Sequence, residues 1–317
     1  MNKTSNFYGI ACGILAGVCW GFSGASGQFI FTNYFLDSTW LVPIRLFVSG
    51  VILLIVVSIN KRDELIAITT NRRDFGRAIL AGIFGTMMLQ FTFFGAVQRS
   101  NAGTATVLQY LCPVITVIYV CLSSHKKPSL KEIVAIAMAL SGIFFVSTHG
   151  SIHELVMTPE GILWGLACAF SMFLATILPA PLYSKYSTEV VMSWGMLAGG
   201  TILGIIYRPW QCDAHVDLPL LGSLFIIIIG GSVLSYYFYG CAVKIIGPTK
   251  TTLIASVEVV AAAVPATIFL GTQYAIIDIL GFLLIIGAVF ELNISLKSFL
   301  PYLETLRKRW SQDSIPF

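Results

Sequence analysis

Three ionisable side chains lie inside apolar runs long enough to cross a membrane: Arg45, Glu258 and Glu291. Charge within hydrocarbon is costly, so such residues usually face a partner or a water-filled cavity and often mark a transport pathway. Glu258 lies about 10 Å into its run at ~1.5 Å per helical residue, too deep for a short carboxylate to reach the surface. We predict that Glu258 carries a proton or binds a substrate amine. The alternative is a structural hydrogen bond.

Arg45 enters its run from the opposite side and lies about 8 Å deep. Its long side chain could bind substrate, or it could extend to the headgroups. These depths leave about 12 Å between the backbones of Arg45 and Glu258 along the normal of a ~30 Å core, so we predict no direct salt bridge between them. Glu291 is expected at a solvated inner mouth.

Aromatic and amide side chains lie near the middle of the same runs. An indole N–H at that depth needs an acceptor, which makes a pocket wall a reasonable place for it. Aromatic walls with a few hydrogen-bonding groups are typical of a small-molecule site, although packing and interhelical hydrogen bonds would use the same residues. The predicted cavity residues are Trp20, Gln90, Gln109, Tyr110, Tyr236 and Tyr239.

Apolar runs dominate the chain, which is 56% hydrophobic and 11% charged with a mean hydropathy of +0.85. A bilayer core takes about 20 helical residues to cross, and ten runs approach that length. The first is too long for a signal peptide, and we expect it to be retained. The runs are Phe7–Phe31, Trp40–Ile59, Ala78–Val97, Ala102–Leu122, Ile133–Thr148, Gly161–Tyr183, Val190–Tyr207, Leu218–Val243, Thr251–Gly271 and Ile279–Leu296.

Basic residues gather in every second connection between these runs. Apart from Arg45, Arg99 and Arg208, all of the 19 Lys and Arg residues lie in those connections or in the two termini. The excess of positive charge in cytoplasmic loops predicts that both termini are cytoplasmic. The net charge of +4 therefore follows membrane topology and indicates no nucleic-acid partner.

The two halves of the chain resemble each other. An offset of 146 aligns Gly85 with Gly231 and Thr106 with Thr252, and an offset of 152 aligns Gly9 with Gly161. We predict a five-helix repeat at 1–150, a second repeat at 151–297 and a cytoplasmic tail at 298–317. Because five is odd, the second repeat must cross the membrane in the opposite sense. Inverted repeats are typical of secondary transporters that bind substrate between their halves.

The chain resembles the EamA-type transporters of the drug/metabolite transporter superfamily over nearly its whole length. The segment Pro43–Phe47 is similar to the Arg-containing second helix of that family, and Glu258 lies where members often carry Glu followed by Pro. Residues 96–113 are similar to its third-to-fourth-helix junction. The chain departs from the pattern at Val259, which replaces that Pro, at Cys112, which replaces the acid of the first repeat, and at Thr272, where an acid often stands.

This resemblance implies an all-helical protein of the bacterial inner membrane that exports small metabolites, amino acids or amphipathic compounds, by proton exchange or facilitated diffusion. We expect alternating access without a cofactor, a metal or enzymatic activity. A passive uniporter or channel is one alternative. A membrane-embedded enzyme is another, but the chain has no Gly-rich phosphate loop with Lys and no run of paired Asp.

Overall fold

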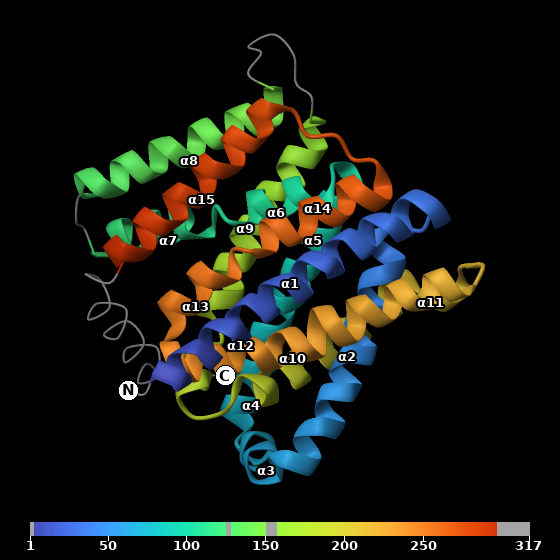
Figure 1. The fold of residues 1–317 in the computed structure, drawn as a ribbon. Coiled ribbons are helices and arrows are strands. Elements are labelled where there is room, and N and C mark those ends of the chain that lie inside the picture. Colours follow the sequence, from blue (N-terminus) through green and yellow to red (C-terminus); the bar gives the residue numbers. More distant parts are fainter. Residues whose placement is uncertain (1–2, 125–127, 150–156, 297–317) are drawn as a thin grey trace.

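The computed structural model describes residues 3–124, 128–149 and 157–296. All regular elements within these residues are helices (Figure 1). The predicted tail, 298–317, lies outside the described residues.

The described residues of the first half form nine helical elements, of which η1 is a π-helix. They are α1 (Lys3–Tyr34), α2 (Ser38–Asn60), α3 (Arg62–Thr70), α4 (Arg72–Ala81), η1 (Gly82–Met87), α5 (Met88–Arg99), α6 (Ala102–Gln109), α7 (Cys112–Ser124) and α8 (Leu130–Thr148).

The second half adds ten between residues 157 and 296, including the 3-10 turns η2 and η3 and the π-helix η4. They are α9 (Pro159–Ile177), η2 (Leu182–Ser184), α10 (Thr188–Tyr207), η3 (Pro209–Gln211), α11 (Leu218–Phe225), η4 (Ile226–Leu234), α12 (Ser235–Ile246), α13 (Pro248–Ala255), α14 (Glu258–Leu270) and α15 (Ile276–Leu296).

Within the described residues, nine helical segments are long and apolar enough to cross a membrane. The elements α4, η1 and α5 together make one of them, and α11, η4 and α12 make another. The 21-residue helix α15 packs along α8 at one side of the bundle (Figure 1). The multi-pass helical architecture is thus confirmed, whereas ten spans and cytoplasmic termini stay predictions.

Equivalent helices of the two halves pack antiparallel, as glycine contacts between α2 and α10 show. A Cβ on Gly50 would lie 2.6 Å from Leu197 N, and a Cβ on Gly200 would lie 2.3 Å from Phe47 N. Moving forward along α2 therefore means moving backward along α10. The same reversal relates α8 and α15, where Gly142 meets Ile285 and Gly281 meets Val146. A twofold axis that exchanges two antiparallel helices is perpendicular to both of them. It therefore lies in the plane of any membrane that these helices span, and the two repeats cross that membrane in opposite senses.

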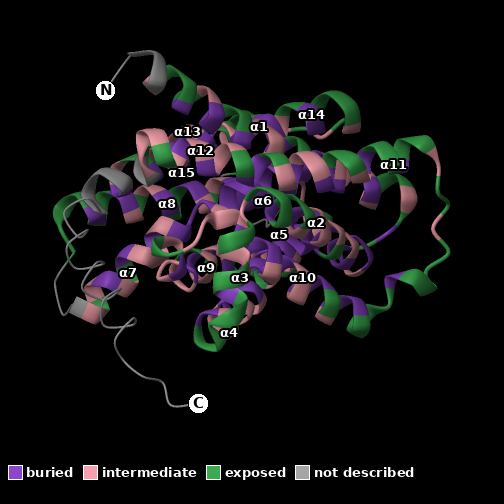
Figure 2. Ribbon diagram, turned by 90° about the horizontal axis from the view of Figure 1, so that it is seen from below, coloured by how far each residue is buried: buried purple, intermediate pink, exposed green. Residues whose placement is uncertain are grey.

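The two repeats also exchange their first helices. In the described residues, α1 packs against η4, α12, α13 and α14 of the second repeat, while α9 packs against η1, α5, α6 and α7 of the first. Gly85 lies against Ala175 of α9, and Gly231 lies against Ser23 of α1. These two contacts are equivalent under the offsets of 146 and 152. Buried residues gather in the middle of the bundle (Figure 2).

Irregular helix geometry recurs at equivalent places in the two repeats. One span is broken between Gln109 and Cys112, and its equivalent is broken between Ala255 and Glu258. Pro113 explains the first break, because proline cannot donate a backbone hydrogen bond inside a helix. Val259 stands at that place in the second break. The π-helices η1 and η4 are also equivalent, since Gly85 and Gly231 lie within them.

The sixth run ends earlier as a helix than its apolar length predicts. The helix α9 ends at Ile177, and a turn followed by η2 replaces the predicted continuation to Tyr183. Pro179 and Pro181 account for the difference, because proline lacks the N–H that a helix needs and disfavours helical geometry in the preceding residue.

Side chains join the two repeats at both ends of the bundle. We call the end with the last turn of α1 the distal end and the opposite one the proximal end. At the distal end, Gln28 Nε2 donates to Thr272 Oγ1 at 2.9 Å and Tyr274 donates to Asn101 Oδ1 at 2.9 Å. Tyr34 also donates to Asp217.

The proximal end carries two ion pairs between the repeats. Lys61 Nζ lies 2.8 Å from Glu189 Oε2, and Lys185 Nζ lies 3.0 Å from Asp74 Oδ2. The carboxylate of Asp74, which is 2% exposed, also accepts from the Tyr186 hydroxyl at 3.0 Å. Side-chain contacts therefore join the two repeats at both ends of the bundle.

Candidate functional site

Arg45 lies in the interior of the bundle and does not extend to the surface. It follows Pro43 in α2, a helix that begins after the N-cap Asp37, and its side chain is only 3% exposed. Its Nε donates to Ser232 Oγ at 3.1 Å, and its Nη2 donates to the Gly231 carbonyl at 2.8 Å. The interpretation that Arg45 reaches the headgroups is therefore wrong.

The π-helix η4 supplies both acceptors for Arg45. A π-helix widens the turn and disturbs the regular ladder of backbone hydrogen bonds, which frees a carbonyl for another donor. Glycine is required at position 231 because a Cβ there would lie 2.2 Å from Ser23 Oγ on α1 and 3.3 Å from Arg45 Nη2. The guanidinium also lies over the ring of Phe94, 5.0 Å from its centroid, as in a cation–π contact.

Glu258 is the first residue of α14 and directly follows the helix break. The Tyr110 hydroxyl lies 3.3 Å from both Glu258 Oε2 and the Ala255 carbonyl. The Tyr110 hydroxyl can therefore donate to the Ala255 carbonyl at the helix break. A broken membrane helix needs such hydrogen bonds to replace those lost from its backbone. Glu258 is 6% exposed. The amino end of α14 suits a carboxylate there, because the free N–H groups at a helix start carry partial positive charge.

The two charges do not form a salt bridge, as predicted. Among the described residues, the ion pairs within 4.0 Å do not include Arg45 with Glu258. They still act on each other electrostatically, and both act on the buried Tyr236 hydroxyl. The centre of the bundle therefore holds one basic and one acidic side chain separated by polar aromatic groups.

Three of the predicted aromatic residues come together. The ring of Trp20 lies 5.6 Å from that of Tyr236 and 5.4 Å from that of Tyr239, centroid to centroid. The Tyr239 hydroxyl is 3.1 Å from Thr252 Oγ1, and the Gln90 side chain lies near Tyr236. Residues of α1, α5, α12 and α13 thus form one aromatic and polar cluster.

Gln109 lies apart from this cluster in its contacts. The Cys168 thiol on α9 is 3.5 Å from Gln109 Oε1. The structure therefore brings Gln109 to the interface between the repeats. We refer to Arg45, Glu258, Trp20, Gln90, Tyr110, Tyr236 and Tyr239 together as the central polar cluster.

Three partners of this cluster were not predicted: Phe94, Ser232 and Thr252. The internal repeat could have pointed to two of them. The offset of 146 matches Thr252 with Thr106, and Ser232 directly follows Gly231, which it matches with Gly85. Phe94 had no such signal, since one phenylalanine among the 22 of this chain carries no mark of a cation–π contact.

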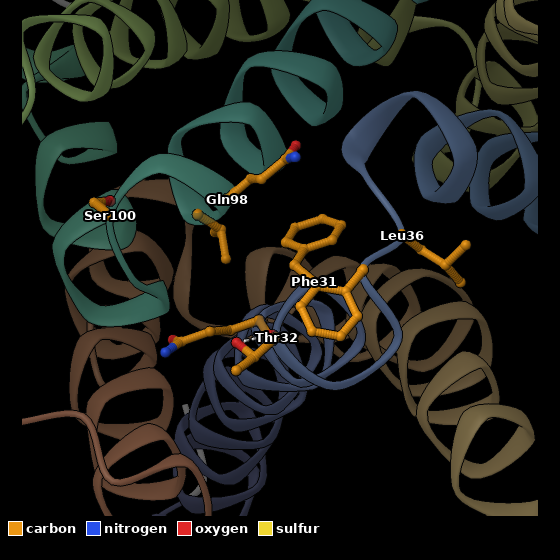
Figure 3. Close-up of a pocket in the computed structure, with 8 residues that line it drawn as sticks. Phe31, Thr32, Leu36, Gln98 and Ser100 are labelled. Atoms are coloured by element: carbon orange, nitrogen blue, oxygen red, sulfur yellow. Dashed lines mark hydrogen bonds between the residues drawn. The ribbon is translucent and has the colours of Figure 1, made fainter.

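One cavity within the described residues lies away from this cluster. It has a volume of about 320 Å³ and lies at the distal end, between the last turns of α1 and the end of α5 (Figure 3). Its lining includes Gln28 and Gln98 but no member of the central polar cluster. The prediction of a central cavity is thus not tested by this opening.

His149 and Asp278 form a pair at the distal end. His149 Nε2 lies 3.1 Å from Asp278 Oδ2, which joins the end of α8 to the start of α15. Within the described residues, no group of three His, Cys, Asp or Glu side chains could hold a metal ion. His153 and Glu154, which are near His149 in sequence, lie outside the described residues.

Comparison with known proteins places the chain in a family. The EamA-like transporter family profile matches residues 7–148 and 159–294. The "Uncharacterized inner membrane transporter YicL" of Salmonella typhimurium is 31% identical over 281 residues, which cover 89% of this chain and 93% of that protein. An "Uncharacterized transporter in sor 3'region" of Acidianus ambivalens is 25% identical over 226 residues, covering 71% of this chain and 82% of that protein.

A solved structure shows the same fold. One protein crystal structure superposes with a TM-score of 0.61 at 14% identity and covers 95% of this chain and 100% of that chain. The family profile spans both halves of the sequence, and the helices have the length and composition of membrane spans. The chain is therefore a multi-pass membrane protein that belongs to the EamA-like transporter family.

Proposed function

We propose that this protein is a secondary transporter of the cell inner membrane that moves a small metabolite by alternating access. Its substrate would be an amino acid or another small amphipathic compound, moved in the direction of export. The family and the name of the Salmonella relative support membrane transport. The observation that carries the mechanism is the meeting of two inverted repeats at buried Arg45 and Glu258.

In this proposal the two charged side chains of the central polar cluster have different roles. Arg45 attracts a substrate carboxylate, because its guanidinium has N–H donors beyond the two that η4 uses. Glu258 binds a substrate amine or carries the coupling proton. The rings of Trp20, Tyr236 and Tyr239 provide an apolar and aromatic wall for the rest of the molecule.

Alternating access follows from the contacts at the two ends. Opening the proximal end would break Lys61–Glu189 and Lys185–Asp74. Opening the distal end would break Gln28–Thr272 and its neighbours. Because the repeats pack in nearly equivalent ways, each opening keeps the contacts of the other end, which is the arrangement expected of inverted-repeat transporters.

The test is flux in proteoliposomes under an imposed pH gradient, with candidate amino acids as substrates. Wild type should accumulate substrate against its gradient, and Glu258→Gln should abolish the accumulation without loss of folded protein. Glu160→Gln is the matched control, since Glu160 is a 77% exposed carboxylate paired with Arg99. Flux that only dissipates gradients, and that is the same in Glu258→Gln, would instead indicate a passive uniporter or channel.

A further inference from the structure

The distal cavity has the size of a small-molecule site. Its volume of about 320 Å³ falls within the range of about 300–1,000 Å³ common for ligand pockets. Figure 3 shows Phe31 and Thr32 of α1, Leu36 of the following link, and Gln98 and Ser100 at the end of α5 around it. None of its lining side chains is Asp, Glu, Lys or Arg. An ion entering this cavity would find no countercharge in the lining.

Both hydroxyl groups of the lining already donate to backbone carbonyls. Thr32 donates its proton to the Gln28 carbonyl at 2.9 Å, and Ser100 donates its proton to the Ala96 carbonyl at 2.7 Å. Each oxygen keeps lone pairs for an incoming donor. The adjacent Arg99 is turned to α9, where its Nε lies 3.2 Å from Glu160 and its guanidinium covers Trp164 at 4.7 Å. The cavity therefore favours an uncharged ligand that brings N–H or O–H groups.

Phe35 provides an unusual apolar surface at this cavity. Its backbone has φ 54, in the left-handed region that bulky residues rarely adopt, and the residue is 91% exposed. Backbone strain of this kind persists where the surrounding structure holds it and gathers at ligand sites and switch regions. With Phe31 also in the lining, two aromatic rings are available to a flat apolar group.

We propose that the distal cavity is a second binding site, separate from the central polar cluster, for an uncharged compound that combines an aromatic ring with an N–H donor. Gln28 connects this site to the contact between the repeats. Its side chain lines the cavity, accepts from Ala102 N at 2.8 Å and donates to Thr272 at 2.9 Å. A bound ligand would hold α1 against α6 and α14 and so oppose distal opening. This second effect rests on the proposed transport function.

Binding is tested on purified protein by saturation-transfer NMR, with benzamide as the probe. Benzoate and benzylamine carry the same ring with a negative and a positive charge. Benzamide should bind at least ~5-fold more tightly than either ion, because an ion pays for its desolvation without a countercharge. Equal binding of benzoate or benzylamine would overturn the assignment of ligand class.

Neighbouring residues on α1 provide the variant and its control. Thr32→Trp fills the cavity, whereas Asn33→Trp adds the same ring outside the lining. Each substitution also removes one hydrogen bond from the side chain to the backbone carbonyl four residues earlier. Benzamide affinity should fall about tenfold or more in Thr32→Trp and stay within about twofold in Asn33→Trp. Thr32→Met, a smaller filler, should give an intermediate loss and serves if the tryptophan variant does not fold. Unchanged affinity in both Thr32 variants would overturn the site.

The effect on gating is tested separately in proteoliposomes. Thr32→Trp should slow substrate exchange severalfold relative to Asn33→Trp, because the added ring acts as a bound ligand. Equal exchange by the two variants would overturn the link between the cavity and distal opening. Absence of flux in wild type would contradict the transport function, and the NMR result would still decide the site.

Discussion

Cys112 and Glu258 occupy the same position in the two repeats: each is the first residue of the second part of a broken helix, 146 residues apart. Only one of the two equivalent positions thus carries a carboxylate. Arg45 also lacks a charged counterpart, because Gly195 stands at the corresponding place in α10 when the helices are matched by Gly50 and Gly200. The backbone is nearly symmetric, whereas the buried charge is not, so the inward and outward arrangements need not be equally stable.

The close approach of α1 to η4 predicts opposite behaviour for two adjacent glycines. Gly231→Ala would place a Cβ 2.2 Å from Ser23 Oγ and should lower stability by about 1–3 kcal/mol through overpacking. Gly230→Ala meets nothing within 4 Å and should change stability by less than about 1 kcal/mol. Thermal unfolding in detergent measures both. Similar melting temperatures for the two variants would contradict this account of the contact.

The phenol of Tyr110 should stabilise the broken helix. Tyr110→Phe removes the donor shared by Glu258 and the Ala255 carbonyl, and each long hydrogen bond is worth about 0.5–1.5 kcal/mol. We expect a loss of about 1–2 kcal/mol in the free energy of unfolding, with weaker substrate binding. Tyr207→Phe, at a 41% exposed residue, is the control. Equal stability of the two variants would show that the Tyr110 hydroxyl does not support the break.

Arg45 should not tolerate replacement by lysine. The guanidinium bridges Ser232 and the Gly231 carbonyl at once, which a single ammonium group cannot do with the same geometry. Arg45→Lys should lower stability by about 1–3 kcal/mol and reduce transport about tenfold or more. Arg208→Lys, on an exposed residue at the end of α10, should retain both properties. Full transport by Arg45→Lys would remove the guanidinium from the mechanism.

The distal contact between Tyr34 and Asp217 predicts sensitivity to acid. The hydrogen bond from the Tyr34 hydroxyl lowers the pKa of Asp217 below its ordinary value of 3.8, and the hydrogen bond from Leu220 N–H contributes less to the same shift. A carboxyl with a lowered pKa contributes stability above its unfolded value and loses it as the pH falls through the folded pKa. Melting temperature should therefore fall less steeply below about pH 4 in Asp217→Asn than in wild type. Asp213→Asn, in the same loop, should keep the wild-type slope, and an unchanged slope in Asp217→Asn would contradict the assignment.

Sequence alone was sufficient for the class of the fold. Apolar runs of membrane length can satisfy their backbone only as helices, so composition and length predict the spans directly. The offset of 146 was also visible, and the structure places the two helix breaks and the two π-helices on it. Local chemistry explains the first break, because Pro113 lies next to it, but the second break has Val259 at that place.

Only the tertiary structure decided which partners the buried residues take. Depth along a helix could not show whether Arg45 turns outward or inward, because that depends on a carbonyl released by η4, 186 residues away in sequence. Nor could a pattern predict that Tyr110 meets Glu258, 148 residues away. Contacts of this kind form only when distant helices pack together, and their energies depend on distances and angles that sequence spacing does not determine.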